Sequence, residues 1–280
     1  SWPVFETNLP ASAYRKVRRR NDYYEANFYH VGIGFRKLYF DKFDLECAFY
    51  QNKKGIQSLN FDARHAYTKG INIMPNLVLE KQDFLVKGLD MKYTIVTPII
   101  RSNMTDTATT RRQWDGTVTQ AVGETDDNLF NESHDRQFEV RSKFNLKYTR
   151  GRHTLNLNDQ YAYSAYTPKD ERMKGYLGFD PSAYPSRMTA NNIGLSHLFV
   201  SDNRRLQNSL TLSIYYLNSR IYRTSDALAK GQATDELAPK QTRVERSYYG
   251  FSEGFSYELW KLHQYDHFFD IVPAISHIAF

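Results

Sequence analysis

Paired carboxylates beside a histidine can activate a water molecule, and one segment of the sequence, ETDDNLFNESHD at positions 124–135, gathers these residue types. A hydrolase could use such a set as general acid and general base. The same composition is typical of an acidic, solvated loop, and we favour that interpretation. The candidate residues are Glu124, Asp126, Asp127, His134 and Asp135.

A second candidate site is the segment HQYDHFFD, in which His263, Asp266, His267 and Asp270 follow the spacing i, i+3, i+4 and i+7. On a helix, that spacing would place four metal ligands on one face. The segment is predicted to form a turn and a strand, where the spacing brings nothing together, so we expect no metal. Cys47 is the only cysteine, which excludes an intrachain disulfide and a multi-cysteine metal site.

The net charge of +6 and the run RKVRRR, Arg15 to Arg20, raise the question of nucleic acid. A phosphate-binding surface would need basic residues on one face with stacking aromatic residues around them. The remaining charges are mixed along the chain. We therefore expect no nucleic acid partner, and interpret the basic run as a solvated loop that can touch anionic lipid head groups.

Composition excludes a transmembrane helix but not a sheet. The chain has 280 residues, of which 41% are hydrophobic, and its mean hydropathy of −0.64 leaves no apolar run of the required length. Aromatic residues are abundant, with 21 Tyr and 18 Phe. The chain starts at Ser1 without an apolar leader, so we expect a mature product or a fragment, with residues 1–280 forming one incomplete domain.

The segment QFEVRSKFNLKYTRGRHTLNLNDQYAYSAY, residues 137–166, alternates apolar and polar residues, turns after a few residues and alternates again. Alternate side chains of a strand point to opposite faces of a sheet, so this pattern predicts a hairpin with one apolar face. The same period of two continues through most of the chain. It predicts ten strands, over residues 24–37, 43–53, 71–82, 87–97, 136–148, 153–166, 189–200, 206–222, 246–260 and 267–278.

The connections between these strands alternate between short turns and long polar loops. The long loops cover residues 54–70, 98–135, 167–188 and 223–245. In an antiparallel up-and-down sheet, every second connection lies at the same end, so all long loops would share one rim. Together with strands much longer than the usual 5 to 6 residues, this asymmetry is typical of an outer-membrane β-barrel.

Aromatic residues are placed where the borders of a membrane would be, since amphipathic rings prefer head-group depth. We expect one group near the short turns and one near the long loops. These are Tyr39, Phe40, Phe43, Phe84, Tyr148, Phe199 and Trp260, and then Tyr24, Tyr166, Tyr222 and Tyr248.

Three polar residues fall on the predicted lipid face, Asp159, His197 and Glu253, where a charge near the midplane costs about 2 kcal/mol or more. If Tyr166 pairs with Thr189, Asp159 lies opposite Ser196 and beside His197. Glu253 has no such partner in this prediction.

Several segments resemble TonB-dependent receptors, above all the SusC/RagA-like group of Bacteroidetes. They are the hairpins KQDFLVKGLDMKYTIV, Lys81 to Val96, and KLYFDKFDLECAFY, Lys37 to Tyr50, and the loop segment TTRRQWDG, Thr109 to Gly116. The resemblance implies a 22-stranded barrel in the bacterial outer membrane, to which this chain contributes about ten strands. It also implies a plug domain and a TonB box, neither of which we find in this sequence.

This resemblance implies binding and import of a nutrient such as a glycan, peptide or chelate, driven by the TonB complex through the plug, without enzymatic activity or a cofactor. A SusD-like surface lipoprotein would be a partner. In the long-loop rim we expect Arg111, Arg112 and Trp114 to contact the ligand, by stacking and by paired hydrogen bonds. The residues expected to face the plug are Asp44, Glu46, Asp90, Lys92, Glu139, Arg141, Lys143 and Lys147.

Two other classes stay open. Ten strands that close on themselves would form a barrel of the size of the omptin proteases, which makes an outer-membrane hydrolase the rival. A soluble β-sandwich that serves in binding or adhesion also alternates along its strands. It predicts shorter strands and no difference in loop length between the two rims.

Overall fold

The computed structural model describes residues 2–4, 15–17, 20–58, 60–125, 131–170, 179–202, 204–223, 240–262 and 265–269. Long antiparallel strands dominate this part of the chain, and one sheet contains nearly all of them. The all-β, antiparallel architecture predicted from the alternation is therefore confirmed.

The strands agree with the predicted ranges to within a few residues at most ends. The main sheet contains β3 (Tyr24–Arg36), β4 (Lys42–Gly55), β5 (Tyr67–Lys81), β6 (Leu89–Val96), β7 (Ile99–Asp106), β10 (Asn131–Arg150), β11 (His153–Thr167), β12 (Ser186–Val200), β13 (Leu206–Arg223), β14 (Lys240–Leu262) and β15 (Tyr265–Phe269). Two short hairpins, β1 (Trp2–Val4) with β2 (Arg15–Val17) and β8 (Thr110–Arg112) with β9 (Val118–Gln120), and the 3-10 turn η2 (Pro181–Ala183) complete the described elements.

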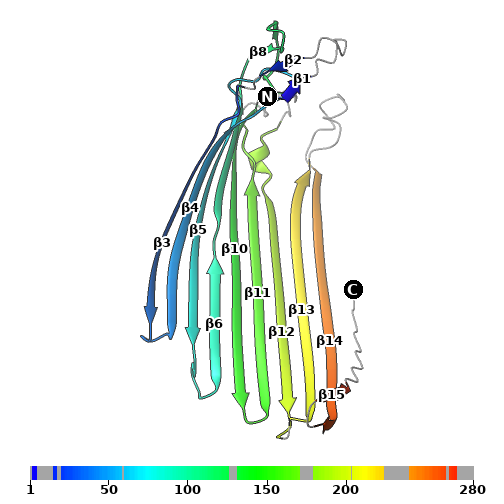
Figure 1. Cartoon of the computed structure of the whole chain (residues 1–280). Coiled ribbons are helices and arrows are strands. Elements are labelled where there is room, and N and C mark those ends of the chain that lie inside the picture. The colour runs from blue at the N-terminus through cyan, green and yellow to red at the C-terminus, as the bar shows by residue number, and fades with distance from the viewer. Residues whose placement is uncertain are drawn as a thin grey trace.

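Each long strand pairs with the strands that precede and follow it in the chain, so the sheet is an up-and-down meander (Figure 1). Its order runs from β15 through β14, β13, β12, β11, β10, β6, β5 and β4 to β3. The first and last strands of this path, β3 and β15, do not pair with each other. Within the described residues the sheet is thus open, with two edges.

The predicted long loop 98–135 is wrong in its first part. Residues 99–106 form β7, which continues β6 and pairs with the same two neighbours, β5 and β10. Pro98 lacks an N–H group and interrupts the strand. The ladder is nevertheless kept, because Thr97 N donates to Pro75 O at 3.0 Å and Glu139 N donates to Pro98 O at 2.9 Å. The two segments β6 and β7 therefore act as one long strand.

The asymmetry of the connections is confirmed (Figure 1): the short turns gather at one end of the sheet and the long connections at the other. Residues with positive φ sit in the short turns, among them Lys37 at 58°, Gly88 at 87° and Gly151 at 57°. Glycine adopts this region without steric cost. At Gly88 it is also required for space, since a Cβ atom would lie 2.4 Å from the carbonyl oxygen of Thr149.

Two neighbouring rows of cross-strand partners define the two faces of the sheet. The row of the apolar face runs across nine strands and is apolar or aromatic at every position except Asp159. It consists of Phe35, Phe43, Leu79, Tyr93, Phe144, Asp159, Ile193, Ile214 and Tyr249. The adjacent row, on the polar face, is charged, polar or glycine throughout. It consists of Arg36, Lys42, Glu80, Lys92, Asn145, Asn158, Gly194, Ser213 and Gly250.

The apolar face is not covered by a second layer in the described part of the chain. Ile33, Leu45 and Ile214 are exposed at 53%, 45% and 48%, whereas the buried hydrophobic residues of the described chain are Ala63, Ala66, Met91 and Trp114. A β-sandwich would bury this face against a second sheet, and soluble monomers rarely expose a continuous apolar surface of this kind. Among the described residues, no helix is both long and apolar enough to cross a membrane.

The predicted aromatic group at the long-loop rim needs a correction. The cross-strand partners of Tyr24, Tyr166 and Tyr248 are Lys54, Gln137 and Tyr215, which places all three tyrosines on the polar face. Successive side chains of a strand point to opposite faces, so each of these tyrosines lies on the face opposite to that of its neighbours in the sequence. These rings line the polar wall rather than a lipid border, and of this group only Tyr222 lies on the apolar face.

Candidate functional site

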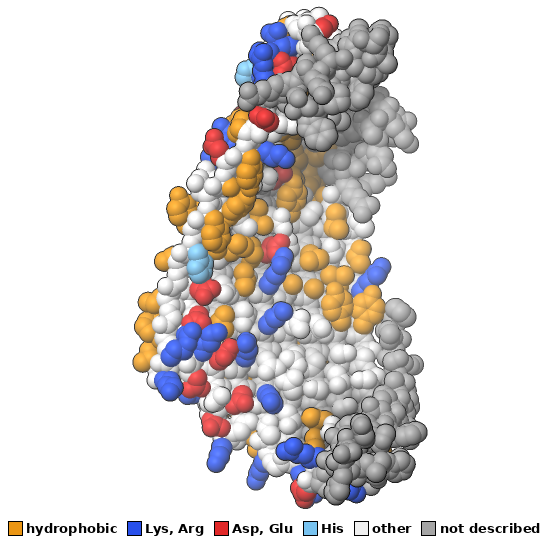
Figure 2. Space-filling model, viewed as in Figure 1, with side chains coloured by type: hydrophobic (Ala, Val, Ile, Leu, Met, Phe, Trp, Pro, Cys, Tyr) orange, Lys and Arg blue, Asp and Glu red, His pale blue; other side chains and the backbone are white. Residues whose placement is uncertain are grey.

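The polar face is divided into a charged half near the short turns and a half richer in aromatic residues near the long loops. Figure 2 shows this face: acidic and basic side chains gather in its lower part, and hydrophobic and tyrosine side chains lie above them. All eight residues predicted to face a plug belong to this polar face, by alternation and by cross-strand pairing. Their contact with a plug stays a prediction.

Ion pairs hold the charged half together. Arg36 Nη1 lies 2.5 Å from Asp44 Oδ1, and Lys42 Nζ lies 3.4 Å from Asp44 Oδ2. On the next strands, Lys92 Nζ lies 2.9 Å from Glu80 Oε1. The pair of Arg36 and Asp44 joins β3 to β4, and the pair of Lys92 and Glu80 joins β6 to β5. Lys42 lies on the same strand as Asp44, and its Nζ is also 4.0 Å from Glu80 Oε1, which joins β4 to β5.

The remaining plug-facing residues differ in how far they are already engaged. Glu139 is buried, with 8% exposure. Its carboxylate accepts a hydrogen bond from Gln137 Nε2 and forms an ion pair with Arg141 at 2.5 Å. Lys143 and Lys147 form no ion pair with any described residue. These two lysines are therefore the cations of this group that are most free to bind an anionic partner.

The aromatic half begins at β3 and β4. The hydroxyl groups of Tyr24 and Tyr50 are hydrogen bonded at 2.6 Å, and Phe28 is the cross-strand partner of Tyr50. Phe28 is exposed at 63% and Tyr24 at 58%. A second pair, Tyr215 and Tyr248, has ring centroids 5.6 Å apart. Exposed rings on a wall that is otherwise polar are suited to stacking on sugar or aromatic groups.

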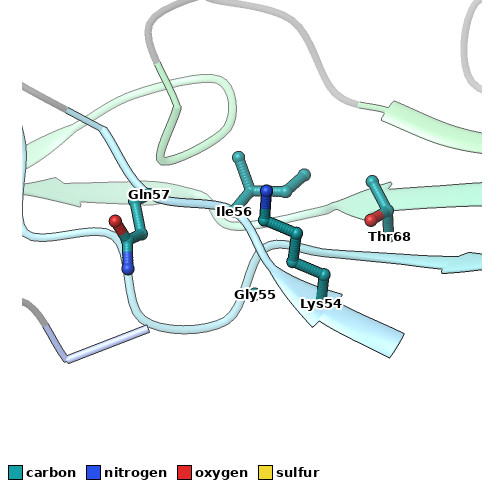
Figure 3. Close-up of a pocket in the computed structure, with 5 residues that line it drawn as sticks. All are labelled: Lys54, Gly55, Ile56, Gln57 and Thr68. Carbon is teal, nitrogen blue, oxygen red and sulfur yellow. The ribbon is translucent and has the colours of Figure 1, made fainter. Parts of the chain in front are cut away.

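A pocket of about 370 Å³ opens at the loop end of this wall, where β4 and β5 meet (Figure 3). Lys54 and Thr68, which face each other across the two strands, line it together with Gly55, Ile56 and Gln57. The volume falls within the range of small-molecule sites. The lining combines one exposed cation, two further polar side chains and one apolar side chain, which suits a small polar or anionic group.

The loops at residues 56–66 and 107–125 are packed against each other into a compact cap, which contains most of the buried residues of the described chain. Glu124 is its central residue: its carboxylate accepts backbone hydrogen bonds from Arg64 at 2.9 Å, from His65 and from Ala66 at 2.5 Å. Asp106 is exposed at only 1% and accepts hydrogen bonds from the backbone of Glu124 and Thr125. Glu124 thus fastens the loop after β9 to the loop before β5, and Asp106 fastens the loop after β9 to the end of β7.

The predicted ligand residues lie in this cap. Arg111 is buried at 8% exposure, donates to the carbonyl oxygen of Thr125 at 2.6 Å and stacks its guanidinium 4.3 Å from the ring of Phe61. Trp114 is exposed at only 9%. Arg112 is half-buried and donates to Gly116 O at 3.2 Å. As placed, Arg111 and Trp114 shape the cap, and Arg112 is the one of the three with the most access to solvent. Ligand contact by these residues stays a prediction.

The candidate acid and base residues are separated in space. Glu124 is in the cap, whereas His134 and Asp135 are successive residues of β10 and therefore lie on opposite faces. Asp135 accepts a hydrogen bond from Tyr166 Oη at 2.8 Å. Asp126 and Asp127 lie outside the described residues. The described members of this set thus form no shared site.

Sequence reasoning missed His65, whose Nδ1 lies 3.3 Å from Glu124 Oε2. The carboxylate is nearly buried and the imidazole is open to solvent. The two are 59 residues apart, so only the three-dimensional packing of the loops could reveal the contact.

For the predicted metal ligands, His263 and Asp270 lie outside the described residues. Asp266 and His267 occupy successive positions of β15, which pair with Lys261 and Trp260. In the part of the chain that the structure describes, no cluster of three or more histidine, cysteine or acidic residues could hold a metal ion.

The structure gives the neighbours of the three polar residues on the apolar face, Asp159, His197 and Glu253. The expected pairing of Tyr166 with Thr189 is wrong: Tyr166 pairs with Ser186, so Asp159 lies opposite Ile193 and away from His197. The reason is that β12 begins three residues earlier than predicted, which shifts the register. His197 instead stacks on His153, with Nε2 2.9 Å from Nδ1.

Glu253 does have a partner. Asn208 Nδ2 donates to its carboxylate at 3.2 Å from the neighbouring strand β13.

Comparison of the chain with family models, with curated proteins and with solved structures gave no match.

Proposed function

We propose that this chain is the barrel region of a TonB-dependent receptor in the bacterial outer membrane, which binds a nutrient such as a glycan, peptide or chelate and imports it. The observation that carries the proposal is the pair of adjacent rows across nine strands, one apolar and one polar. Lipid would cover the first, and a water-filled or plugged lumen would cover the second.

The dimensions support this placement. On β10, the apolar face is apolar or small from Phe138 to Tyr148. At a strand rise of about 3.3 Å and a tilt of about 40°, this stretch covers about 25 Å along the barrel axis, which matches the apolar band of an outer-membrane barrel. Beyond Phe138 the same face becomes charged, with Arg136.

The open edges support a larger barrel. All thirteen residues of β3 are exposed. A strand edge with unpaired N–H and C=O groups is not tolerated in hydrocarbon. If lipid surrounds the sheet, its two edges need further strands as partners, which the proposed 22-stranded barrel would supply.

Transport fits the polar wall better than catalysis does. Ion pairs and the free cations Lys143 and Lys147 would hold a plug. The exposed rings of Tyr24 and Phe28 and the half-buried ring of Tyr50 would contact the solute near the long loops. The plug would transmit the pull of the TonB complex, and a SusD-like lipoprotein would cover the long-loop rim.

The proposal is tested by an immunoblot of fractionated source cells with an antibody against this chain. We expect a band in the outer-membrane fraction at about three times 32.8 kDa, as a plug and a 22-stranded barrel require. A band near 33 kDa in the membrane would favour a small closed barrel and the hydrolase. The same band in the soluble fraction would favour the adhesive module.

Transport itself is tested by uptake of labelled oligosaccharides and peptides into cells with and without the receptor. Import that requires the receptor and stops when a protonophore collapses the inner-membrane potential supports the proposal. Uptake that is independent of the receptor contradicts it.

A further inference from the structure

Arginine residues form a row on the apolar side of the sheet, at the end where the long loops begin. Cross-strand pairing places Arg101 of β7 opposite Arg136 of β10, and Arg220 of β13 opposite both Arg187 of β12 and Arg243 of β14. All five side chains are exposed. Each lies on the same face as the apolar row, on the loop side of the apolar part of its strand.

The row continues toward the first strands with lysines. Lys53 and Lys69 are cross-strand partners on β4 and β5, and Lys69 lies one step beyond Ile71, the partner of Arg101. The amine of Lys53 is already occupied by the rings of Tyr23 and Tyr67, at 5.6 and 4.8 Å. The arginines are therefore the open part of the row.

Like charges directly opposite each other weaken a sheet. Here this happens in three pairs of arginines: Arg220 joins two of them, and the pair of Arg101 and Arg136 lies on the other side of β11. Among the five arginines, only Arg243 has an acidic partner within the described residues. Glu245 lies 3.0 Å from Arg243. The side chains of Arg101, Arg136, Arg187 and Arg220 form no hydrogen bond or ion pair with the rest of the described chain. An arrangement of this kind is stabilised when an external polyanion binds between the guanidinium groups.

The position of the row indicates which kind of polyanion would bind there. Arg101 and Arg136 come two residues after Ile99 and Phe138, the pair that ends the apolar stretch on β7 and β10. If lipid covers the apolar stretch, the row lies at the depth of the head groups. Arginine binds phosphate oxygens through two parallel hydrogen bonds, so the group that fits both the depth and the charge is a phosphorylated lipid head group.

We propose that Arg101, Arg136, Arg187, Arg220 and Arg243 bind the phosphate groups of lipids in the leaflet that surrounds the long-loop rim. The inference rests on the part of the proposed function that places the apolar face in a membrane, and it does not depend on the transported solute. Bound lipid would fix the height of the barrel in the membrane and offset the repulsion between the paired arginines.

The test uses the full-length receptor, purified in a neutral detergent and titrated with phosphatidic acid or phosphatidylcholine, with bound lipids counted by native mass spectrometry. We expect the receptor to prefer phosphatidic acid. The double variant Arg187→Gln/Arg220→Gln should lose about thirtyfold in affinity, given the contribution of each of two basic residues to binding an anionic membrane surface. Arg101→Gln/Arg136→Gln should behave in the same way.

The matched control is Arg246→Gln, which removes an exposed arginine from the polar face of β14 and should leave lipid binding unchanged. Equal loss in the control and the row variants would overturn the proposal. So would full competition by millimolar inorganic phosphate, because it would indicate a site for free phosphate rather than for a lipid.

A spin label at Ile214→Cys distinguishes an error in the lipid-binding role of the arginines from an error in the membrane placement of the sheet. If the label is accessible to oxygen in lipid and the row variants bind phosphatidic acid as tightly as the unchanged receptor does, only the proposed role of the arginines in lipid binding is wrong. If the label is accessible to water, the membrane placement itself is wrong.

Discussion

Glu124 and Ala66 are joined by a hydrogen bond of 2.5 Å from the backbone N–H of Ala66 to the carboxylate, although 58 residues separate them in the sequence. With the bonds from Arg64 and His65, this contact makes one buried side chain the fastening point of two long loops. Because these bonds join loop residues to one another, their loss can loosen the cap without breaking the ladders of the sheet below it.

Replacement of Glu124 by alanine should therefore release the cap. The backbone N–H groups of Arg64, His65 and Ala66 would lose their acceptor, at a cost of about 1–3 kcal/mol for each buried group that finds no water. We expect faster hydrogen exchange in residues 60–66 and 121–125, measured by mass spectrometry, and unchanged exchange in β11 to β13. Slower or equal exchange in the cap would contradict this role of Glu124.

Gly88 should be required for the turn between β5 and β6. A Cβ atom there would meet the carbonyl oxygen of Thr149 at 2.4 Å, and φ is 87°. Gly88→Ala should lower the free energy of unfolding by well over 1 kcal/mol. Gly151→Ala is the matched control, because φ is 57° and no atom lies within 4 Å of the added Cβ.

Urea-induced unfolding in detergent measures both glycine variants. Gly151→Ala should lower the free energy of unfolding only by the cost of backbone strain, about 1 kcal/mol. Equal losses for the two variants would show that the contact with Thr149 does not matter.

The pair of Arg36 and Asp44 should couple measurably but weakly. The guanidinium is exposed and Asp44 is at 15% exposure, so solvent screens part of the attraction. A double-mutant cycle with Arg36→Gln and Asp44→Asn should give a small favourable coupling, which falls as salt is raised. A coupling that does not change with salt would contradict an electrostatic origin.

Tyr50 should contribute to solute binding, whereas its neighbour in the sequence, Phe49, should not. Tyr50 is on the polar wall, hydrogen bonded to Tyr24, and Phe49 is on the apolar face, where its ring lies 6.0 Å from that of Tyr29. Tyr50→Ala should weaken uptake of the transported solute by about fivefold, as the loss of a stacking ring of about 1 kcal/mol implies. Phe49→Ala is the control, and comparable loss of uptake from it would argue against the aromatic wall.

The sheet could be predicted from the sequence because its signal is local. Alternation in residues 137–148 and 153–166 is continuous, and the hairpin between them formed as predicted, with Arg150 opposite His153. The strand β7 was missed because Pro98 interrupts the run and because RSNMTD, residues 101–106, is too polar to show an apolar face. Its membership in the sheet depends on its partners in β5 and β10.

The loop cap could not be predicted in the same way. Its contacts, such as Glu124 with Ala66 or Arg111 with Phe61, join residues of different loops, and no periodicity records them. Arg111 and Trp114 were selected because their chemistry suits a ligand. The same properties, a planar cation and a large ring, also suit the interior of a packed loop. Burial distinguishes the two uses, and burial depends on the tertiary structure.

The most direct test of the central claim compares Ile214 and Ser213, neighbours in β13 that belong to the apolar and the polar row. In a Cys47→Ala background of the full-length protein in lipid vesicles, spin labels at Ile214→Cys and Ser213→Cys would report access to oxygen and to a water-soluble nickel complex. We predict oxygen access at 214 and a more polar environment at 213. Equal access of the nickel complex to both labels would contradict a membrane-spanning sheet.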